Sequence, residues 1–70
     1  MKRITDKQSN VLQFIILYIR DKGYPPCVRE IGDRFGITPR AVSGHITALE
    51  RKGYIKITSG IARGIRVIER

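Results

Sequence analysis

The sequence predicts a mainly α domain of the α+β class, in which three helices precede a two-stranded β-hairpin. Three observations indicate this arrangement. Residues 5–53 contain three segments with apolar side chains at helical spacing, each followed by a glycine. After residue 53 the apolar period changes from about 3.6 to about 2 residues. The chain has 70 residues and forms one domain with a small core, since a chain of this size buries roughly 60 % of its surface.

The first helix is expected to begin near Asp6 and to end at Lys22. Thr5 followed by Gln8 is a capping-box pattern, because the threonine oxygen can accept from one free amide and the glutamine can reach back. Gly23 supplies the left-handed residue that ends the helix. One broad face collects apolar side chains, namely Val11, Leu12, Phe14, Ile15, Tyr18 and Ile19.

Ile16 and Leu17 lie outside this face, next to the polar side of the helix. They are either scattered surface hydrophobic residues, which are common, or a contact site for another copy or another domain. The second interpretation keeps a protein-interaction module open as an alternative function.

The second helix is expected from about Val28 to Phe35, after a stiff extended connector at residues 24–26. Cys27 occupies the N-cap, where Ser, Thr or Asp would accept more strongly, but Glu30 can offer its carboxylate to the first turn. Gly36 ends the helix. The stripe expected to be buried consists of Val28, Ile31 and Phe35, with Gly32 allowing close approach by a neighbouring helix.

The third helix begins at Thr38 and Pro39, because a hydroxyl N-cap followed by proline at the first helical position is a strong start signal. It is expected to run to Lys52 and to stop at Gly53. Its inward face is predicted to carry Val42, Ile46 and Leu49, with His45 on the flank. So short a link after the second helix forces a steep crossing between the two helices.

Two short strands follow, because Ile55 and Ile57 alternate with polar residues, as do Ile65 and Val67 after a glycine-containing loop at residues 59–64. Three helices and a terminal hairpin make a winged helix-turn-helix. We place the helix-turn-helix at about residues 28–48 and the wing at about residues 54–68.

The chain is strongly basic, with 14 Lys and Arg against 6 Asp and Glu, a net charge of +8 and a pI near 10.4. From Thr38 onward, seven cationic residues stand against only Glu50 and Glu69. This excess predicts a polyanionic partner, either nucleic acid or an anionic membrane surface, unless it merely keeps the surface solvated. The apolar run at residues 14–19 is far too short to span a bilayer. Of the two polyanionic partners, we expect nucleic acid and no membrane.

Catalytic and metal chemistry have little support in the sequence. Cys27 is the single cysteine and His45 the single histidine, so neither an internal disulfide nor a structural metal centre is expected. No nucleophile–base pair, carboxylate pair or phosphate-cradling glycine loop occurs, and His45 is interpreted as a packed flank residue. We expect no enzyme activity and no cofactor. A reducing cytosolic setting fits the cysteine count, and no signal peptide is recognisable.

The exposed start of the third helix is small and polar except for one arginine, which suits close approach to base edges. Arg40 could fork onto guanine O6 and N7, Ser43 could donate or accept, and the methyl group of Ala41 could touch thymine. Gly44 would bring the backbone, or a water, close to the DNA. Thr38 could cap the helix, bind a phosphate, or both. The alternative for Arg40 is a solvated surface arginine, and we favour the groove contact.

Contacts to the DNA backbone are predicted from side chains around this face and from the wing, namely Arg29, Thr47, Arg51, Lys52, Ser59 and Arg63. Arg51 and Lys52 also satisfy the dipole at the end of the third helix, which needs no DNA. One cationic side chain among the wing glycines fits a loop that follows the backbone or enters the minor groove.

The chain resembles the amino-terminal DNA-binding domain of the LexA family of bacterial SOS repressors. The matching pieces are the opening "T-x-x-Q", "GYPPCVREIGDRFGI", "H-x-x-ALERKGYI" and the wing "SGIARGIRV", so the likeness covers essentially all 70 residues. The resemblance implies a cytoplasmic, nucleoid-associated repressor that binds palindromic operators of DNA-repair genes as a dimer, with the isolated domain a monomer or weak dimer. It also assigns base-reading to Thr38, Arg40, Ala41, Ser43 and Gly44.

The resemblance has two limits. Many family members carry acidic residues where this chain has Ser43 and Gly44, so the operator sequence does not transfer. The family's second domain, a self-cleaving serine–lysine peptidase that responds to the recombinase filament, has no counterpart in these 70 residues. A stand-alone regulator unrelated to the SOS response therefore remains an alternative.

Overall fold

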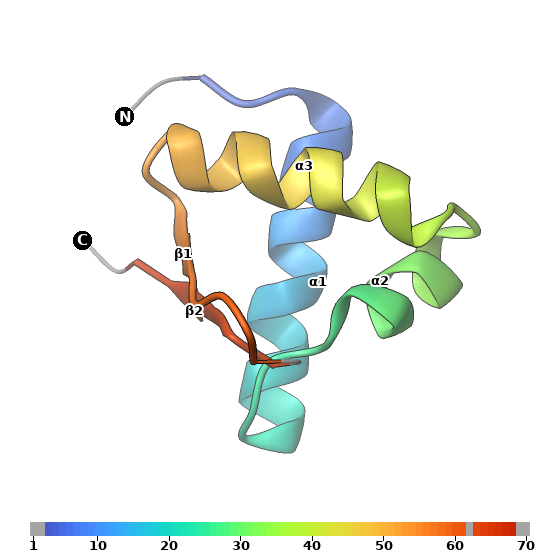
Figure 1. The fold of residues 1–70 in the computed structure, drawn as a ribbon, viewed down its shortest axis with the longest axis vertical. Coiled ribbons are helices and arrows are strands. Elements are labelled where there is room, and N and C mark those ends of the chain that lie inside the picture. Colours follow the sequence, from blue (N-terminus) through green and yellow to red (C-terminus); the bar gives the residue numbers. More distant parts are fainter. Residues whose placement is uncertain (1–2, 62, 69–70) are drawn as a thin grey trace.

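The computed structural model describes residues 3–61 and 63–68. Its elements in chain order are α1 (Asp6–Lys22), α2 (Val28–Phe35), α3 (Pro39–Arg51), β1 (Ile55–Ile57) and β2 (Ile65–Val67). Helix α3 crosses α1, with α2 beside one end of α3 and the hairpin beside the other (Figure 1). The three helices and the hairpin confirm the predicted winged helix-turn-helix. The third helix ends one residue earlier than expected, with Lys52 as its C-cap.

The helix starts follow the predicted capping chemistry. In α1 the amide of Gln8 donates to Thr5 Oγ1 at 3.1 Å, and the amide of Thr5 donates to Gln8 Oε1 at 3.3 Å. In α3 the amide of Ala41 donates to Thr38 Oγ1 at 3.2 Å. These bonds satisfy amides that have no partner inside their own helix, so local sequence decides where both helices begin.

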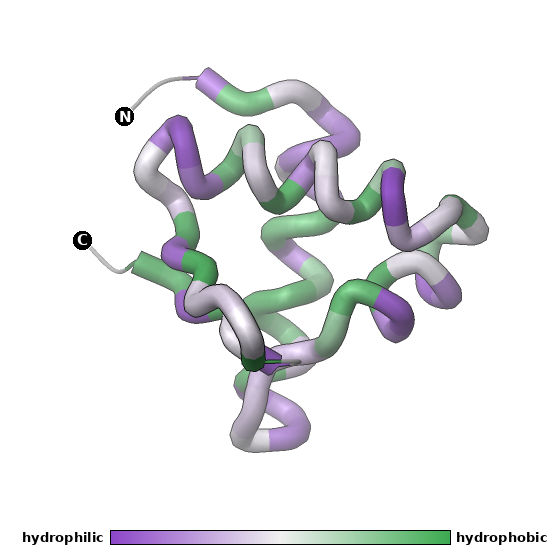
Figure 2. Tube along the Cα trace, viewed as in Figure 1, coloured by the Kyte–Doolittle hydropathy of each residue, from purple (hydrophilic) through white to green (hydrophobic). Residues whose placement is uncertain are grey.

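The core lies where the three helices and the hairpin meet. Its buried residues are Val11, Leu12, Ile15, Ile31, Val42, Ile46, Leu49, Ile55 and Ile65. Figure 2 shows hydrophobic residues recurring along α1 and in both strands, and several of them belong to this core. Ile16 packs partly against this core, whereas Leu17 is 55 % exposed. The predicted apolar patch therefore reduces to one exposed leucine, which weakens the protein-interaction alternative.

The turn between α2 and α3 is tightened by two glycines. Gly36 adopts a left-handed conformation with φ +66° and ends α2. A Cβ atom on Gly32 would lie 2.8 Å from the carbonyl oxygen of Ile37 and 3.6 Å from the side chain of Val42. Gly32 was expected to admit a neighbouring helix, and Val42 of α3 does lie beside it, while the backbone of the turn comes closer still. This close approach seats the start of α3 against α2.

The wing is an antiparallel pair in which Ile55, Lys56 and Ile57 face Val67, Arg66 and Ile65. The amide of Thr58 donates to the carbonyl of Gly64 at 2.9 Å, which extends the pairing into the loop. Side chains alternate between the core and solvent, as the sequence predicted. Within the described residues, no helix has the length and apolar character needed to cross a membrane.

Candidate nucleic-acid interface

Helix α3 separates a buried side from a bare side. Val42, Ile46 and Leu49 are at most 5 % exposed and hold the helix on the core. The opposite side consists of exposed residues, namely Arg40, Ala41, Ser43, Gly44, Thr47 and Arg51. The predicted DNA-facing residues of the helix are thus brought together on one accessible surface. Neither the wing nor α1 covers them.

Small residues keep the middle of this surface flat. Gly44 has open space around it, since a Cβ atom built there would meet nothing within 4 Å. Ala41 and Ser43 flank it with short side chains. A glycine in a helix interior costs about 1 kcal/mol relative to alanine, and here no packing need offsets that cost. A flat backbone surface is suited to close approach by a large ligand such as a nucleic acid groove.

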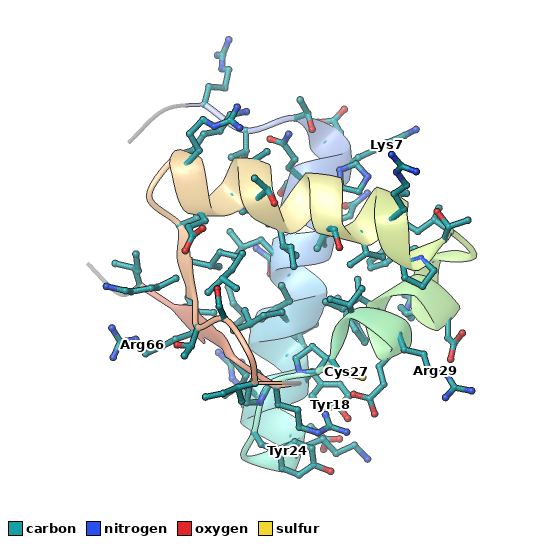
Figure 3. All side chains as sticks on the ribbon, viewed as in Figure 1. Lys7, Tyr18, Tyr24, Cys27, Arg29 and Arg66 are labelled. Carbon is teal, nitrogen blue, oxygen red and sulfur yellow. The ribbon has the colours of Figure 1, made fainter. Side chains whose placement is uncertain are left out.

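Exposed arginines lie in the first turns of α2 and α3. Arg40 is exposed in the first turn of α3 and has no hydrogen-bond or ion-pair partner among the described residues. Arg29 projects from α2 away from the rest of the molecule, as Figure 3 shows. Thr38 is exposed and uses its oxygen as the N-cap of α3. The amino end of α3 and two free guanidinium groups therefore give this region a positive potential.

Lys52 makes a contact that the sequence did not indicate. Its ammonium donates to Gln8 Oε1 at 2.8 Å and is partly buried against the start of α1. Gln8 is the residue whose side chain also completes the α1 capping box. Lys52 therefore ties the end of α3 to the beginning of α1. Arg51 beside it is exposed, as the predicted backbone contact requires.

Arg63 likewise bonds to other parts of the same chain, at the surface of the molecule. Its Nη1 and Nη2 atoms donate to Glu30 Oε1 at 2.7 Å and Oε2 at 3.1 Å, and Nη1 also donates to the carbonyl of Pro25 at 2.9 Å. The guanidinium lies 4.8 Å from the ring centre of Tyr24. Sequence reasoning assigned this arginine to a phosphate, whereas the geometry fixes it against the start of α2. Ser59, the other wing residue predicted to contact DNA, is exposed.

The carboxylate of Glu30 is held by several donors at once. Besides Arg63, it accepts from the amide of Cys27 at 3.0 Å and from the hydroxyl of Tyr18 at 3.0 Å. The bonds from Arg63, followed by the Cys27 amide, lower the pKa of Glu30 to about 2. Burial raises the pKa of the Tyr18 hydroxyl, which therefore remains a donor at neutral pH. The carboxyl group of Glu30 is therefore ionised throughout the physiological pH range.

His45 lies on the flank of α3, as predicted, and is half-buried. It borders a shallow hollow of about 160 Å³ that Val11, Phe35 and Ile37 line with apolar surface. Among the described residues, no group of three potential metal ligands comes together. The position fits packing between α1 and the turn.

Comparison with known proteins assigns the family. A profile described as the LexA DNA binding domain matches residues 1–64. This chain belongs to the LexA DNA-binding domain family. The LexA repressor of Thermotoga neapolitana is 54 % identical over 67 residues, which is 96 % of this chain and 34 % of that protein. The LexA repressor of Leptospira interrogans is 48 % identical over 68 residues, or 97 % of this chain and 34 % of that protein. The chain spans about a third of the length of these relatives.

In this LexA-family domain, sequence reasoning missed Glu50. Its Oε2 atom accepts from the backbone amide of Ile57 at 2.8 Å and so joins α3 to β1. The spacing of seven residues across a helix end and a turn follows no local rule. The exposed helical position of Glu50 gave no signal, because any solvated glutamate looks the same in sequence.

Proposed function

We propose that this chain is the DNA-binding domain of a LexA-type transcriptional repressor, which binds duplex DNA in a sequence-specific manner and blocks access of polymerase to promoters. The observation that carries the proposal is the bare, cationic side of α3, whose exposed residues have no internal task. Base-reading is proposed for Thr38, Arg40, Ala41, Ser43 and Gly44. Backbone contacts are proposed for Arg29, Thr47, Arg51 and Ser59, while Lys52 and Arg63 are left out because their charged groups have internal partners.

The chemistry of the surface suits the major groove. Arg40 carries two parallel N–H groups that match O6 and N7 of guanine, and this pairing distinguishes guanine from the other bases. Ser43 can donate to or accept from a base edge, and the methyl group of Ala41 fits against the methyl of thymine. The open backbone at Gly44 lets the helix enter deeply.

The relatives named LexA repressor support a proposal on where the domain acts and on which DNA. We propose that it acts in the bacterial cytoplasm, at the nucleoid, on palindromic operators of DNA-repair genes. Two copies bind one operator, and the domain alone is a monomer or a weak dimer in solution. Release through the recombinase filament would require a peptidase domain beyond these 70 residues.

Selection of bound duplexes from a random pool tests the proposal. We expect an enriched sequence that repeats in inverted orientation at a fixed spacing. The logarithm of affinity for that duplex should fall steeply with the logarithm of salt concentration, by several units per decade. A pool without enrichment, or binding with a shallow salt dependence, would contradict the proposal.

Two arginine variants then locate the interface. Arg40→Ala should cost about 1–3 kcal/mol of binding free energy on the selected duplex and relax the preference at one base pair. Arg20→Ala is the matched control, because Arg20 is exposed in the last turn of α1, remote from α3 (Figure 1). An equal loss on selected and random duplexes would reduce Arg40 to a phosphate contact.

A further inference from the structure

The guanidinium of Arg63 meets three segments that lie far from the wing in the sequence. It forms two parallel hydrogen bonds to Glu30 of α2, one to the carbonyl of Pro25 in the connector, and a longer one of 3.5 Å to the hydroxyl of Tyr18 in α1. It also stacks on the ring of Tyr24. A planar guanidinium with this many partners is held in one orientation, so the part of the wing that carries Arg63 is held in place as well.

The carboxylate that receives Arg63 is itself held by two further donors. Glu30 is bonded to the Cys27 amide at the start of α2 and to the hydroxyl of Tyr18. The ring of Tyr18 in turn lies 5.7 Å from that of Phe14 and 5.9 Å from that of Tyr24. Figure 3 shows Tyr18, Tyr24 and Cys27 in the same part of the molecule, around the connector at residues 24–26. A fixed acceptor makes the contact a mechanical link between α2 and the wing.

The wing has a second link to a helix carboxylate, made by a backbone amide instead of a guanidinium. At the other helix of the helix-turn-helix, the carboxylate of Glu50 accepts from the amide of Ile57. One carboxylate from α2 and one from α3 therefore hold the two sides of a hairpin whose strands have three residues each. A two-stranded hairpin of this length has little stability of its own. Ile55 and Ile65 anchor its strands in the core, and the two links hold the loop that extends beyond them.

Resting on the proposed function, we propose that Arg63 is a positioning residue for DNA binding. It holds the wing loop in register with the exposed side of α3 by binding Glu30, and it affects DNA affinity through the place of the loop rather than by touching a phosphate. The wing contacts that depend on it come from neutral groups of the loop such as Ser59 and backbone amides. Among residues 58–64, Arg63 is the single cationic side chain.

The two roles predict opposite effects of Glu30→Gln. If Arg63 bound a phosphate, this change would release the guanidinium and remove an anion near the DNA, so affinity would stay equal or rise. If Arg63 positions the wing, the change weakens its bond and affinity falls by about tenfold, in the same direction as Arg63→Ala. Glu30→Gln combined with Arg63→Ala should then be no weaker than Arg63→Ala alone.

Salt dependence and conservative replacement separate the roles further. A lost phosphate contact lowers the log–log salt slope by about 0.9, whereas loss of a positioning residue leaves the slope unchanged. Arg63→Lys keeps a point charge that serves well at a phosphate but cannot form the paired bonds to Glu30. We expect Arg63→Lys to bind as weakly as Arg63→Ala. Full recovery of affinity by lysine, or a slope reduced by about one, would overturn the proposal.

The experiment uses the duplex recovered from the random pool, at a temperature where circular dichroism shows every variant folded. Arg66→Ala is the matched control, since Arg66 is an exposed cation of the same hairpin without a partner among the described residues. The Arg66→Ala variant should lose less DNA affinity than the Arg63→Ala variant does.

A second measurement needs no DNA. Residual dipolar couplings of backbone amides report the orientation of β1 and β2 relative to α2 and α3. We expect Glu30→Gln and Arg63→Ala to change the hairpin couplings while those of the helices persist. Unchanged couplings in both variants would refute the positioning role. Failure of the proposed function is recognised separately, because the wild-type protein would then enrich no duplex while the couplings still respond to the variants.

Discussion

The amide of Ile57 donates to the carboxylate of Glu50, and this bond closes the outer edge of β1. Thr58 and Gly64 form a hydrogen-bonded pair in the hairpin, so the alternation of an antiparallel ladder directs the amide of Ile57 away from β2. An unpaired edge amide is a site for unwanted strand pairing. Helix α3 occupies that site with a side chain, and the wing is joined to the proposed recognition helix as a result.

Removing this acceptor should loosen β1 locally. In Glu50→Ala, hydrogen exchange at the Ile57 amide should accelerate by about five- to tenfold, because one hydrogen bond of modest net value is lost. Exchange measured by NMR checks this, with the amides of α1 as an internal reference. Glu50→Gln keeps a carbonyl oxygen and should stay close to the wild-type rate. Equal acceleration throughout the domain would mean that Glu50 acts on global stability instead.

Acid should weaken the fold through Glu30. The folded-state pKa of about 2 lies below the ordinary value of 4.5, so the stabilising contribution is complete above pH 4.5 and is lost as the pH falls toward 2. Urea unfolding measured between pH 2 and pH 7 should show this loss. In Glu30→Gln the pH dependence over the same interval should be shallower. A carboxyl resonance of Glu30 that titrates at its ordinary value would contradict the interpretation.

Gly44→Ala should raise stability while lowering DNA affinity. The open space at Gly44 accepts a methyl group without a clash, and alanine gains about 1 kcal/mol of helix propensity. Thermal unfolding should therefore occur at a higher temperature. Binding to the selected duplex should weaken, because the methyl group separates the helix backbone from the groove. Unchanged affinity would show that the DNA does not approach at this position.

Gly32→Ala should have the opposite effect on stability. Its Cβ atom would lie 2.8 Å from the carbonyl oxygen of Ile37, so the turn between α2 and α3 has to shift. Overpacking of this kind costs about 1–3 kcal/mol, which a denaturant titration can measure. Together with Gly44→Ala it forms a matched pair, one glycine required by packing and the other free of it. A stability equal to that of the wild type would show that the turn relaxes without cost.

Thr38→Ala tests the start of α3. Loss of the bond from the Ala41 amide should cost about 1 kcal/mol of unfolding free energy, and Thr38→Ser should restore most of it. Affinity for the selected duplex is measured under conditions where both variants are fully folded. A loss of affinity in Thr38→Ala under those conditions assigns the residue a DNA contact as well as the cap.

Local rules accounted for most of the fold. The Thr5–Gln8 pair, the Thr38–Pro39 start and the glycine stops depend on neighbours within a few residues, so the sequence predicted the helix boundaries, with the end of α3 differing by one residue. The buried residues of α3 followed from helical spacing alone. The bare side of the same helix followed for the same reason.

Long charged side chains were harder to place. Lys52 bonds to Gln8 across 44 positions and Arg63 bonds to Glu30 across 33, so only the packed fold decides their partners. In sequence, each looked like another free cation of a basic surface. Their assignment to DNA phosphates rested on charge, and charge alone does not distinguish a solvated arginine from one held by a carboxylate.

The vacant surroundings of Gly44 also bear on how such a domain can change over time. Because the residues that hold α3 on the core and those that face outward share no contacts at this position, substitutions on the outer side carry little penalty for folding. A lineage can therefore drift to new target sites by exchanging a few outward residues, while the architecture that presents them is inherited intact.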